Sequence, residues 1–456
     1  MFNSETKICQ NCNNNFTIEP EDFVFYEKIQ VPAPTFCPEC RMVRRMAWRN
    51  ERALYKRKCD LCQKDIISVY PQQSSYKVYC SNCWNGDKWD AIDYGQNIDF
   101  STSFFEQFKN FQKQVPRLAL VNIKSVNSDY QNYSSENKNC YMIVSAIWDE
   151  DCYYGYRIFS SKDCFDCYDI DKCELCYECS ECTRSYASFH CTLSENLVNC
   201  LFCFDCKNCQ NCFGCVGLRN KSYHWFNEPL SKEEYNNKLK EFQGYNSKLK
   251  ITYQNFLEIL YQKPQRANIN IGSRNCSGYN ISHSKNCLNC FSAREVEDSK
   301  NIFRCSRSKD VFDSIFVDNT ELSYETMSVE QDYNFLFGVQ CWYSRNISYS
   351  DLCLNSSNLF ACIGLRNKSY CIFNKQYSKE EYEELVPKII KHMNDMPYTD
   401  KKGIVYKYGE FFPQELSPFA YNETIAQEYF PLTKEQAIEK GYNWKDPETR
   451  NYKITL

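Results

Sequence analysis

The sequence predicts a mainly β protein in which tandem N-terminal zinc ribbons precede a duplicated right-handed parallel β-helix (a β-solenoid) with capping helices. Three observations predict this architecture. Four Cys-x2-Cys pairs fall within the first ninety residues, and a repeat of 12 residues begins at Asn139. The whole repeat series returns 147 residues later, from Asn286, together with the segment that closes it.

The composition indicates a repetitive protein in a reducing compartment. The 456 residues include 31 cysteines, 35 tyrosines and 31 phenylalanines but only 13 glycines, which is unlike both an average globular chain and a disordered one. No signal-peptide pattern follows Met1, and no apolar run approaches the ~18 to 20 residues of a membrane span. We therefore expect a cytoplasmic protein with no membrane association, whose thiols stay free or bind metal. The net charge of -4 identifies no partner.

The four Cys-x2-Cys pairs form two sets of four thiolates. Each pair places two sulfur atoms on one side of a tight turn, and two such turns complete a tetrahedron around Zn²⁺ that has no open position for a substrate. The alternative is unligated cysteines in a small core. We predict two structural zinc ions per chain, with the ligands Cys9, Cys12, Cys37 and Cys40 in the first set and Cys59, Cys62, Cys80 and Cys83 in the second.

A strongly basic stretch from Arg41 to Lys58 lies between the two sets, with Glu51 as its one acid. It lacks glycine and proline, which predicts a helix from about Met42 to Tyr55. Guanidinium groups bind phosphates and a tryptophan can stack on a base, so we predict nucleic-acid binding, with RNA favoured. The alternative is a solvated helix whose Trp48 packs against the ribbon. The predicted contact residues are Arg41, Arg44, Arg45, Trp48, Arg49, Arg52, Lys56 and Arg57.

The 12-residue repeat runs without a gap through seven units that begin NCYMIVSAIWDE and DCYYGYRIFSSK. Asn or Asp opens five of the seven units, and these residues tolerate the left-handed corners that a solenoid coil needs. In the second series, position 3 of the units alternates between Leu or Phe and a varied residue such as Lys300 or Ser348. This alternation favours a coil of 24 residues over one of 12.

Positions 2, 5, 8 and 11 of the units hold mainly small residues, which predicts that these positions face the core. Cys203 of the first series corresponds to Ser350 of the second, whereas a metal ligand would not be exchanged so freely. Because buried cysteine behaves as a small hydrophobic residue, we expect stacked, reduced core thiols. The alternative is a metal site with spacing that resembles an iron–sulfur run, at Cys173, Cys176, Cys179 and Cys182.

Each series closes with the same device. Capping boxes at Ser231–Glu234 and Ser378–Glu381 predict helices that cover the solenoid ends. An earlier helix starting at Ser103 is expected to dock the ribbons against the first coil through its phenylalanines. The predicted segments are tandem zinc ribbons with the basic helix (1–86), a linker helix (87–126), the first β-helix half (127–230), a capping helix (231–263), the second half (264–377), a capping helix (378–396) and an aromatic tail (397–456).

The block CPECRMVRRMAWRNERALYKRKCDLC, the CELCYEC run and the paired LRNKSY and SKEEY motifs together resemble an uncharacterised bacterial family of zinc-ribbon proteins with Cys-rich β-helix repeats. Similar chains are sometimes labelled CaiB/BaiF-type CoA transferases. The alternating strands and helices and the glycine-rich nucleotide turn of a transferase fold are missing from this sequence. The resemblance therefore implies a fold and no mechanism.

We find no catalytic set, because the four histidines have no neighbouring nucleophile or carboxylate pattern. The first hypothesis is a non-enzymatic zinc-binding protein whose basic region binds nucleic acid while the β-helix serves as a rigid docking scaffold. One alternative is a β-helix enzyme that acts on a carbohydrate or another polymer. Another is a scaffold that binds only proteins. The sequence predicts no oligomeric state.

Overall fold

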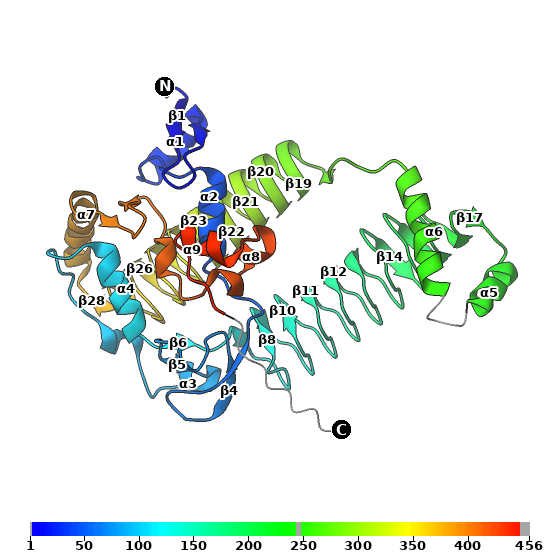
Figure 1. Ribbon diagram of the computed structural model, residues 1–456, viewed down its shortest axis with the longest axis horizontal. Coiled ribbons are helices and arrows are strands. Elements are labelled where there is room, and N and C mark those ends of the chain that lie inside the picture. Colours follow the sequence, from blue (N-terminus) through cyan, green and yellow to red (C-terminus); the bar gives the residue numbers. More distant parts are fainter. Residues whose placement is uncertain (1, 243–247, 447–456) are drawn as a thin grey trace. The chain divides into compact units, whose positions relative to one another are not determined.

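A computed structural model describes residues 2–242 and 248–446, which fold into two compact units (Figure 1). The larger unit consists of Met1–Leu118 and Ala267–Leu456, and the smaller unit is Ala119–Arg266. The first β-helix half thus lies in the smaller unit, and the second half, from residue 267 onward, lies in the larger one.

The N-terminal segment contains two antiparallel β-hairpins, each followed by helical structure, as expected for tandem zinc ribbons. Its elements are β1 (Glu5–Ile8), β2 (Asn15–Ile18), α1 (Pro20–Lys28), α2 (Pro38–Met46), β3 (Tyr55–Lys58), β4 (Asp65–Ser68), β5 (Val78–Tyr79), α3 (Ser81–Trp84) and η1 (Ala91–Tyr94).

The basic helix is shorter than predicted and begins earlier. α2 starts at Pro38, and proline is favoured at the first helical position because its missing N–H would be unpaired there anyway. The helix ends at Met46, and Tyr55 lies in β3, where it pairs with Ser68. The prediction of a helix to Tyr55 was wrong because the hairpin that presents the second cysteine set outweighs the helix propensity of the stretch.

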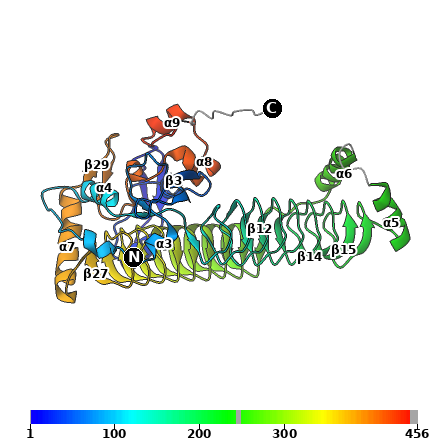
Figure 2. The same cartoon turned by 90° about the horizontal axis from the view of Figure 1, so that it is seen from below.

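Both repeat series form parallel β-solenoids (Figures 1 and 2). In the smaller unit, Ile158 pairs with Ile170, which in turn pairs with Cys182. In the larger unit, Lys309 pairs with Glu321 at the same offset. A coil therefore contains 12 residues, and the expectation of 24 was wrong.

The smaller unit begins with β7 (Asn122–Ile123) and β9 (Ser134–Ser135), and its nine-stranded sheet contains β8 (Gln131–Asn132), β10 (Ile143–Val144), β11 (Tyr156–Phe159), β12 (Tyr168–Asp171), β13 (Ser180–Thr183), β14 (Glu195–Val198), β15 (Lys207–Phe213), β16 (Ser222–Trp225) and β17 (Glu228–Pro229). The eleven-stranded sheet of the larger unit contains β18 (Asn270–Ile271), β19 (Arg274–Ser282), β20 (Lys285–Arg294), β21 (Glu297–Ser306), β22 (Lys309–Asp318), β23 (Glu321–Glu330), β24 (Tyr333–Leu336), β25 (Arg345–Ser348), β26 (Ser357–Phe360), β27 (Ser369–Ile372) and β28 (Lys375–Gln376).

The alternation at position 3 reflects what lies outside the coils. Lys300 reaches Asp22 of α1, with Nζ 2.8 Å from the carboxylate, while Phe312 in the next coil stacks on Phe25 at 3.9 Å between ring centroids. Outward residues in successive coils thus meet different partners, so their alternation carries no information on coil length.

Left-handed corners recur at every third residue of the coils, for example at Asn139, Met142, Ser145 and Trp148 with φ between 54° and 61°. Each coil therefore has four sides of three residues, and each side sends one side chain inward. Such corners are costly for residues other than glycine. Backbone hydrogen bonds to the coils on both sides, and a side-chain ladder in which Asn127 donates to Asn139 at 3.0 Å, stabilise them.

The inward positions are those predicted, positions 2, 5, 8 and 11 of each unit. The cysteines of the smaller unit are no more than 2% exposed, and Cys203 is fully buried. A serine fits the same space in the larger unit, where Ser350 donates to the carbonyl of Ser348 at 2.9 Å and accepts the N–H of Cys362 at 3.0 Å. Cysteine and serine therefore replace one another at this inward position because both side chains fill the same space in the core.

The duplication extends to the closing segments. β16 and β17 form an antiparallel hairpin, as do β27 and β28 at the 147-residue offset. The helices α5 (Lys232–Glu241) and α7 (Lys379–Asp395) follow, and both begin with the predicted capping boxes. A further helix, α6 (Lys248–Gln262), completes the smaller unit. The break expected at Gly244 lies outside the described residues.

The linker helix α4 (Phe104–Gln114) docks differently from the prediction. Its phenylalanines are buried, but Phe104 packs on Tyr349 and Phe360 of the second half, and Phe108 stacks on Phe412 of the tail at 4.6 Å. Outward aromatic residues of the second half provide this contact surface, so the expected docking on the first coil was wrong.

The remaining elements of the larger unit are β6 (Arg117–Leu118), β29 (Tyr398–Thr399), β30 (Val405–Tyr406), η2 (Gln414–Leu416), η3 (Tyr421–Glu423), α8 (Ile425–Tyr429) and α9 (Lys434–Glu439). α9 begins at Thr433 with the predicted capping box. Among the described residues, no helix has both the length and the apolar character required to cross a membrane.

The buried carboxylate of Asp332 should make the stability of the second solenoid half depend on pH. Asp332 is buried in a slot that the first half fills with Ser185, and it accepts the N–H of Ser344 at 2.5 Å. Burial raises the pKa of Asp332 from 3.8 to about 8. The folded state thus holds a proton that the unfolded state releases above pH ~4, so the stability contribution falls as pH rises from about 4 to 8.

We predict that Asp332→Ser gains stability relative to the wild type as the pH rises from 5 to 8, by up to about 1.4 kcal/mol per pH unit, and that the difference levels off above pH 8. Urea unfolding of both proteins at several pH values measures the difference. Parallel pH profiles would contradict the account.

Candidate metal centres and the buried arginine helix

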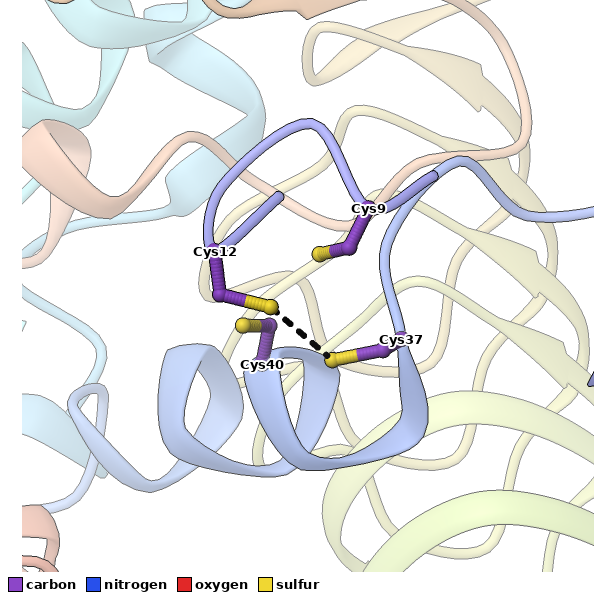
Figure 3. Close-up of side chains that lie close together, drawn as sticks. All are labelled: Cys9, Cys12, Cys37 and Cys40. Atoms are coloured by element: carbon purple, nitrogen blue, oxygen red, sulfur yellow. Dashed lines mark hydrogen bonds between the residues drawn. The ribbon is translucent and has the colours of Figure 1, made fainter. Parts of the chain in front are cut away.

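The first cysteine set joins a hairpin turn to the start of a helix. Cys9 and Cys12 lie in the turn between β1 and β2, which Asn13 closes with a φ of 60° and an N–H donated to the Cys9 carbonyl. Cys37 is the N-cap residue of α2, and Cys40 lies in its first turn. Figure 3 shows the four side chains converging from these two elements.

The second set repeats this construction. Cys59 and Cys62 lie in the turn between β3 and β4, where Gln63 has a φ of 60°. Cys80 is the N-cap residue of α3, and Cys83 lies within that helix. The two sites are thus built by one local arrangement that the Cys-x2-Cys spacing specifies twice.

The sulfur separations fit a metal ion. In each set the four Sγ atoms lie within 4.8 Å of one another. Cys12 and Cys37 are 3.7 Å apart at sulfur, and Cys62 and Cys80 are 3.9 Å apart. A tetrahedral site with metal–sulfur bonds of about 2.3 Å requires sulfur separations of about 3.8 Å, so both sets could each hold one metal ion.

One thiol of each set is favoured as the thiolate that metal binding requires, whereas the pKa values of Cys37, Cys40, Cys80 and Cys83 are raised. Hydrogen bonds from Cys37 and Cys40 hold the pKa of the Cys9 thiol well below its usual value. Burial opposes ionisation of Cys59, but backbone N–H groups, including that of Cys80 at 3.3 Å, lower its pKa to about 7. Helix N-termini, here those of α2 and α3, further stabilise negative charge.

Four protein ligands leave no coordination position for a substrate, so these centres can stabilise structure but offer no Lewis-acid site. The thiols of the solenoid form no comparable group. Among the described residues, only the two N-terminal sets bring three or more metal-ligating atoms together in this way. The iron–sulfur alternative at Cys173, Cys176, Cys179 and Cys182 therefore has no support from the geometry.

The arginines of α2 point at the second solenoid half. Arg41 Nη1 lies 2.6 Å from a carboxylate oxygen of Asp313. One coil further, Glu325 accepts a hydrogen bond from Arg44 at 3.1 Å, and its other carboxylate oxygen lies 3.0 Å from Arg45 Nη1. All five side chains are at most 3% exposed, so this is a buried ionic cluster between the metal-binding segment and the solenoid.

Neighbouring groups complete the cluster. Glu410 of the tail lies 3.1 Å from Arg44, whose guanidinium also lies over the ring of Phe36 at 4.2 Å. Burial opposes the charge on Arg41, but Asp313 and the neighbouring acidic groups together outweigh it and raise the pKa of Arg41 well above its usual value. Burial lowers the pKa of Arg45. Protein carboxylates therefore lie against all three guanidinium groups.

The predicted nucleic-acid contacts are mostly buried in the same way. Trp48 is 1% exposed and stacks on Phe412 at 4.7 Å. Arg49 donates to Glu51 at 2.6 Å, and Arg57 donates to Asp60 at 2.8 Å. Of the eight predicted residues only Arg52 and Lys56 are exposed.

The expectation that α2 presents its arginines to phosphates is therefore not met in this structure, because protein carboxylates occupy the guanidinium groups. The alternative of a solvated helix is not met either, because α2 is buried and Trp48 packs on Phe411 and Phe412 of the tail. Binding of nucleic acid by the chain stays a prediction.

Sequence reasoning missed the acidic partners of these arginines. Asp313 and Glu325 occupy position 4 of successive repeat units, each directly after an aromatic residue. A second buried ion pair, between Arg117 and Asp351, was also missed. The aromatic–acid pairs are visible in the sequence, but Arg41 and Asp313 are 272 residues apart, so no local pattern connects them.

A shallow groove of about 530 Å³ follows the flank of the second half. Asp332 borders it, but its carboxylate hydrogen-bonds to Ser344 within the coil. Acidic and basic side chains mix along the groove, which is typical of a solvated charged face; they are Glu295, Glu297, Glu321, Arg307, Lys309 and Arg345. The alternative of an enzyme that acts on a carbohydrate or another polymer stays a prediction.

Comparisons with known proteins add no family assignment: no protein-family model matches the sequence, and no curated protein matches it either.

We predict that the two cysteine sets bind metal independently. Cys37→Ser/Cys40→Ser should lower the metal content from two ions per chain to one, because it removes two of four ligands in one set and none in the other. Elemental analysis of purified full-length protein measures this ratio. Unchanged metal content in the variant would contradict the ligand assignment.

Substitution of an acid in the buried ionic cluster should cause a large loss of stability in the larger unit. Glu325→Gln should destabilise the larger unit by about 3–5 kcal/mol, because two buried guanidinium groups lose a charged partner. The matched control is Glu178→Gln at the equivalent repeat position of the first half, where the carboxylate is exposed, and we expect a change of about 0.5 kcal/mol or less. Denaturant unfolding of both variants distinguishes these outcomes, and equal effects would contradict the account.

Proposed function

We propose that the protein is a non-enzymatic zinc-binding scaffold of the cytoplasm, which docks another protein along its solenoid. The observation that carries this proposal is the buried ionic cluster. The cluster binds the metal-binding segment to the second solenoid half, so that this segment has a structural role. The regular outward faces of the solenoid then remain as surfaces for a partner.

Zinc is the proposed metal at both cysteine sets. Four thiolates at tetrahedral separations suit Zn²⁺, which tolerates this geometry without any redox chemistry. Each ion would join a hairpin to a helix start and so hold the segment that carries the arginines. A reducing cytoplasm fits the many free thiols of the chain.

RNA binding, the other candidate partner, has weaker support. Arg52 and Lys56 are the predicted contacts left at the surface, and Arg52 already lies 3.6 Å from Glu428. Recruitment of the remaining arginines would require α2 to leave the solenoid, which would expose Asp313 and Glu325 without their partners. The cost of breaking such buried pairs is several kcal/mol.

The test uses protein isolated from its native source under reducing conditions. We expect two zinc ions per chain by elemental analysis, and a complex with a second protein whose mass is unchanged after nuclease treatment, as measured by light scattering and mass spectrometry. A complex that nuclease reduces to the chain alone would establish the nucleic-acid alternative. A chain that runs at its own mass in fresh extract would contradict the scaffold proposal.

A further inference from the structure

The second solenoid half shows how this solenoid receives a helix. Two successive coils each present an aromatic residue at position 3 and an acid at position 4, Phe312–Asp313 and Tyr324–Glu325. Phe25 of α1 stacks on Phe312. The arginines of α2 form ion pairs with the two acids. This side of the coils therefore supplies rings for apolar contact and carboxylates for guanidinium groups.

The spacing of the two elements explains the fit. Neighbouring coils are about 4.8 Å apart, as strands in any sheet are, and one helical turn rises about 5.4 Å. Arg41 reaches Asp313 in one coil, while Arg44 and Arg45, one turn on, reach Glu325 in the next. A helix with arginines at i, i+3 and i+4 thus matches acids that repeat once per coil.

The first half carries the same pattern at the 147-residue offset. Phe165–Asp166 and Tyr177–Glu178 stand where Phe312–Asp313 and Tyr324–Glu325 stand in the second half. In the smaller unit Phe165 is 42% exposed and both acids are exposed, while Tyr177 is half-buried beside His190. Glu178 accepts the Tyr177 hydroxyl at 2.8 Å and lies 2.8 Å from His190 Nδ1, so it is oriented at the surface.

The first-half surface is more acidic than its counterpart. Asp169 and Glu181 occupy the positions of Phe316 and Ser328, which in the second half contact Arg49. Four carboxylates therefore gather over two coils. One of them, Asp169, lies 3.3 Å from Arg157. The aromatic stripe continues in the neighbouring coils with Tyr141, Tyr153 and Phe189, whose rings lie in successive units.

We infer that this face of the first half, the acidic–aromatic face formed by Phe165, Asp166, Asp169, Tyr177, Glu178 and Glu181, docks an arginine-bearing helix of another protein. The inference rests on the proposed scaffold function and names the site and the chemistry of its partner. Guanidinium groups at i, i+3 and i+4 of that helix pair with Asp166 and Glu178, and its apolar side chains lie on Phe165 and Tyr177. Four clustered carboxylates repel the phosphates of nucleic acid.

The test uses the full-length protein and a fluorescent peptide of residues 38–52 carrying Cys40→Ser, which presents the arginine spacing of α2. We expect the peptide to bind with an affinity that falls as ionic strength rises. Asp166→Asn/Glu178→Gln should weaken binding at least about tenfold, since two charged contacts are lost. Both substitutions keep the size of side chains at exposed positions, so the fold should be retained.

The matched control is Asp171→Asn/Glu174→Gln, which removes two acids from other sides of the coil that carries Asp166 and should change the affinity less than about twofold. Failure of the peptide to bind at low ionic strength, or equal weakening by both double variants, would overturn the inference. A native complex that persists in the Asp166→Asn/Glu178→Gln protein would overturn this site alone and leave the scaffold function standing. A single-stranded RNA that binds in place of the peptide would overturn both.

Discussion

A coil of 12 residues encloses four inward side chains, one from each three-residue side, and this limit governs the rest of the structure. So thin a core admits mainly small or slender side chains, which is why cysteine, serine, alanine and valine share the inward positions. Such a core buries little apolar area per residue. Further stability has to come from hydrogen bonds between coils and from what packs on the outside.

The second half shows the outside contribution. Aromatic residues that point away from its core, such as Tyr349 and Phe360, are fully buried because α4 and the tail cover them. The arginines of α2 occupy the same side of the coils. Buried ion pairs often contribute less stability than apolar contacts of the same size, but they fix position and partner. Metal ions at the cysteine sets would hold the hairpins and helix starts that place these arginines.

Local sequence was sufficient wherever a structure depends on near neighbours. The two cysteine sets, the inward thiols, the capping boxes at Ser231 and Ser378 and the duplication all follow from short spacings. It was insufficient where distant segments meet. The 24-residue coil was inferred from outward residues that meet different partners outside the coils. The nucleic-acid surface was inferred largely from the arginines of α2, whose partners Asp313 and Glu325 lie more than 270 residues away. Charge alone does not distinguish a solvated helix from one neutralised inside the protein.

The two solenoid halves share outward residues as well as inward ones, and the shared outward residues bear on function. After a segment is duplicated, packing of the core requires similar residues at the inward positions only. Outward residues are free to differ between the two copies. Phe165, Asp166, Tyr177 and Glu178 point outward, yet all four are identical to their second-half counterparts at the 147-residue offset. In the second half these positions are explained by the helix they receive. In the first half the coils themselves do not require them, because neighbouring units place His190 or Tyr154 at the same corner. A docked helix of matching charge would explain why these outward residues are the same in both halves.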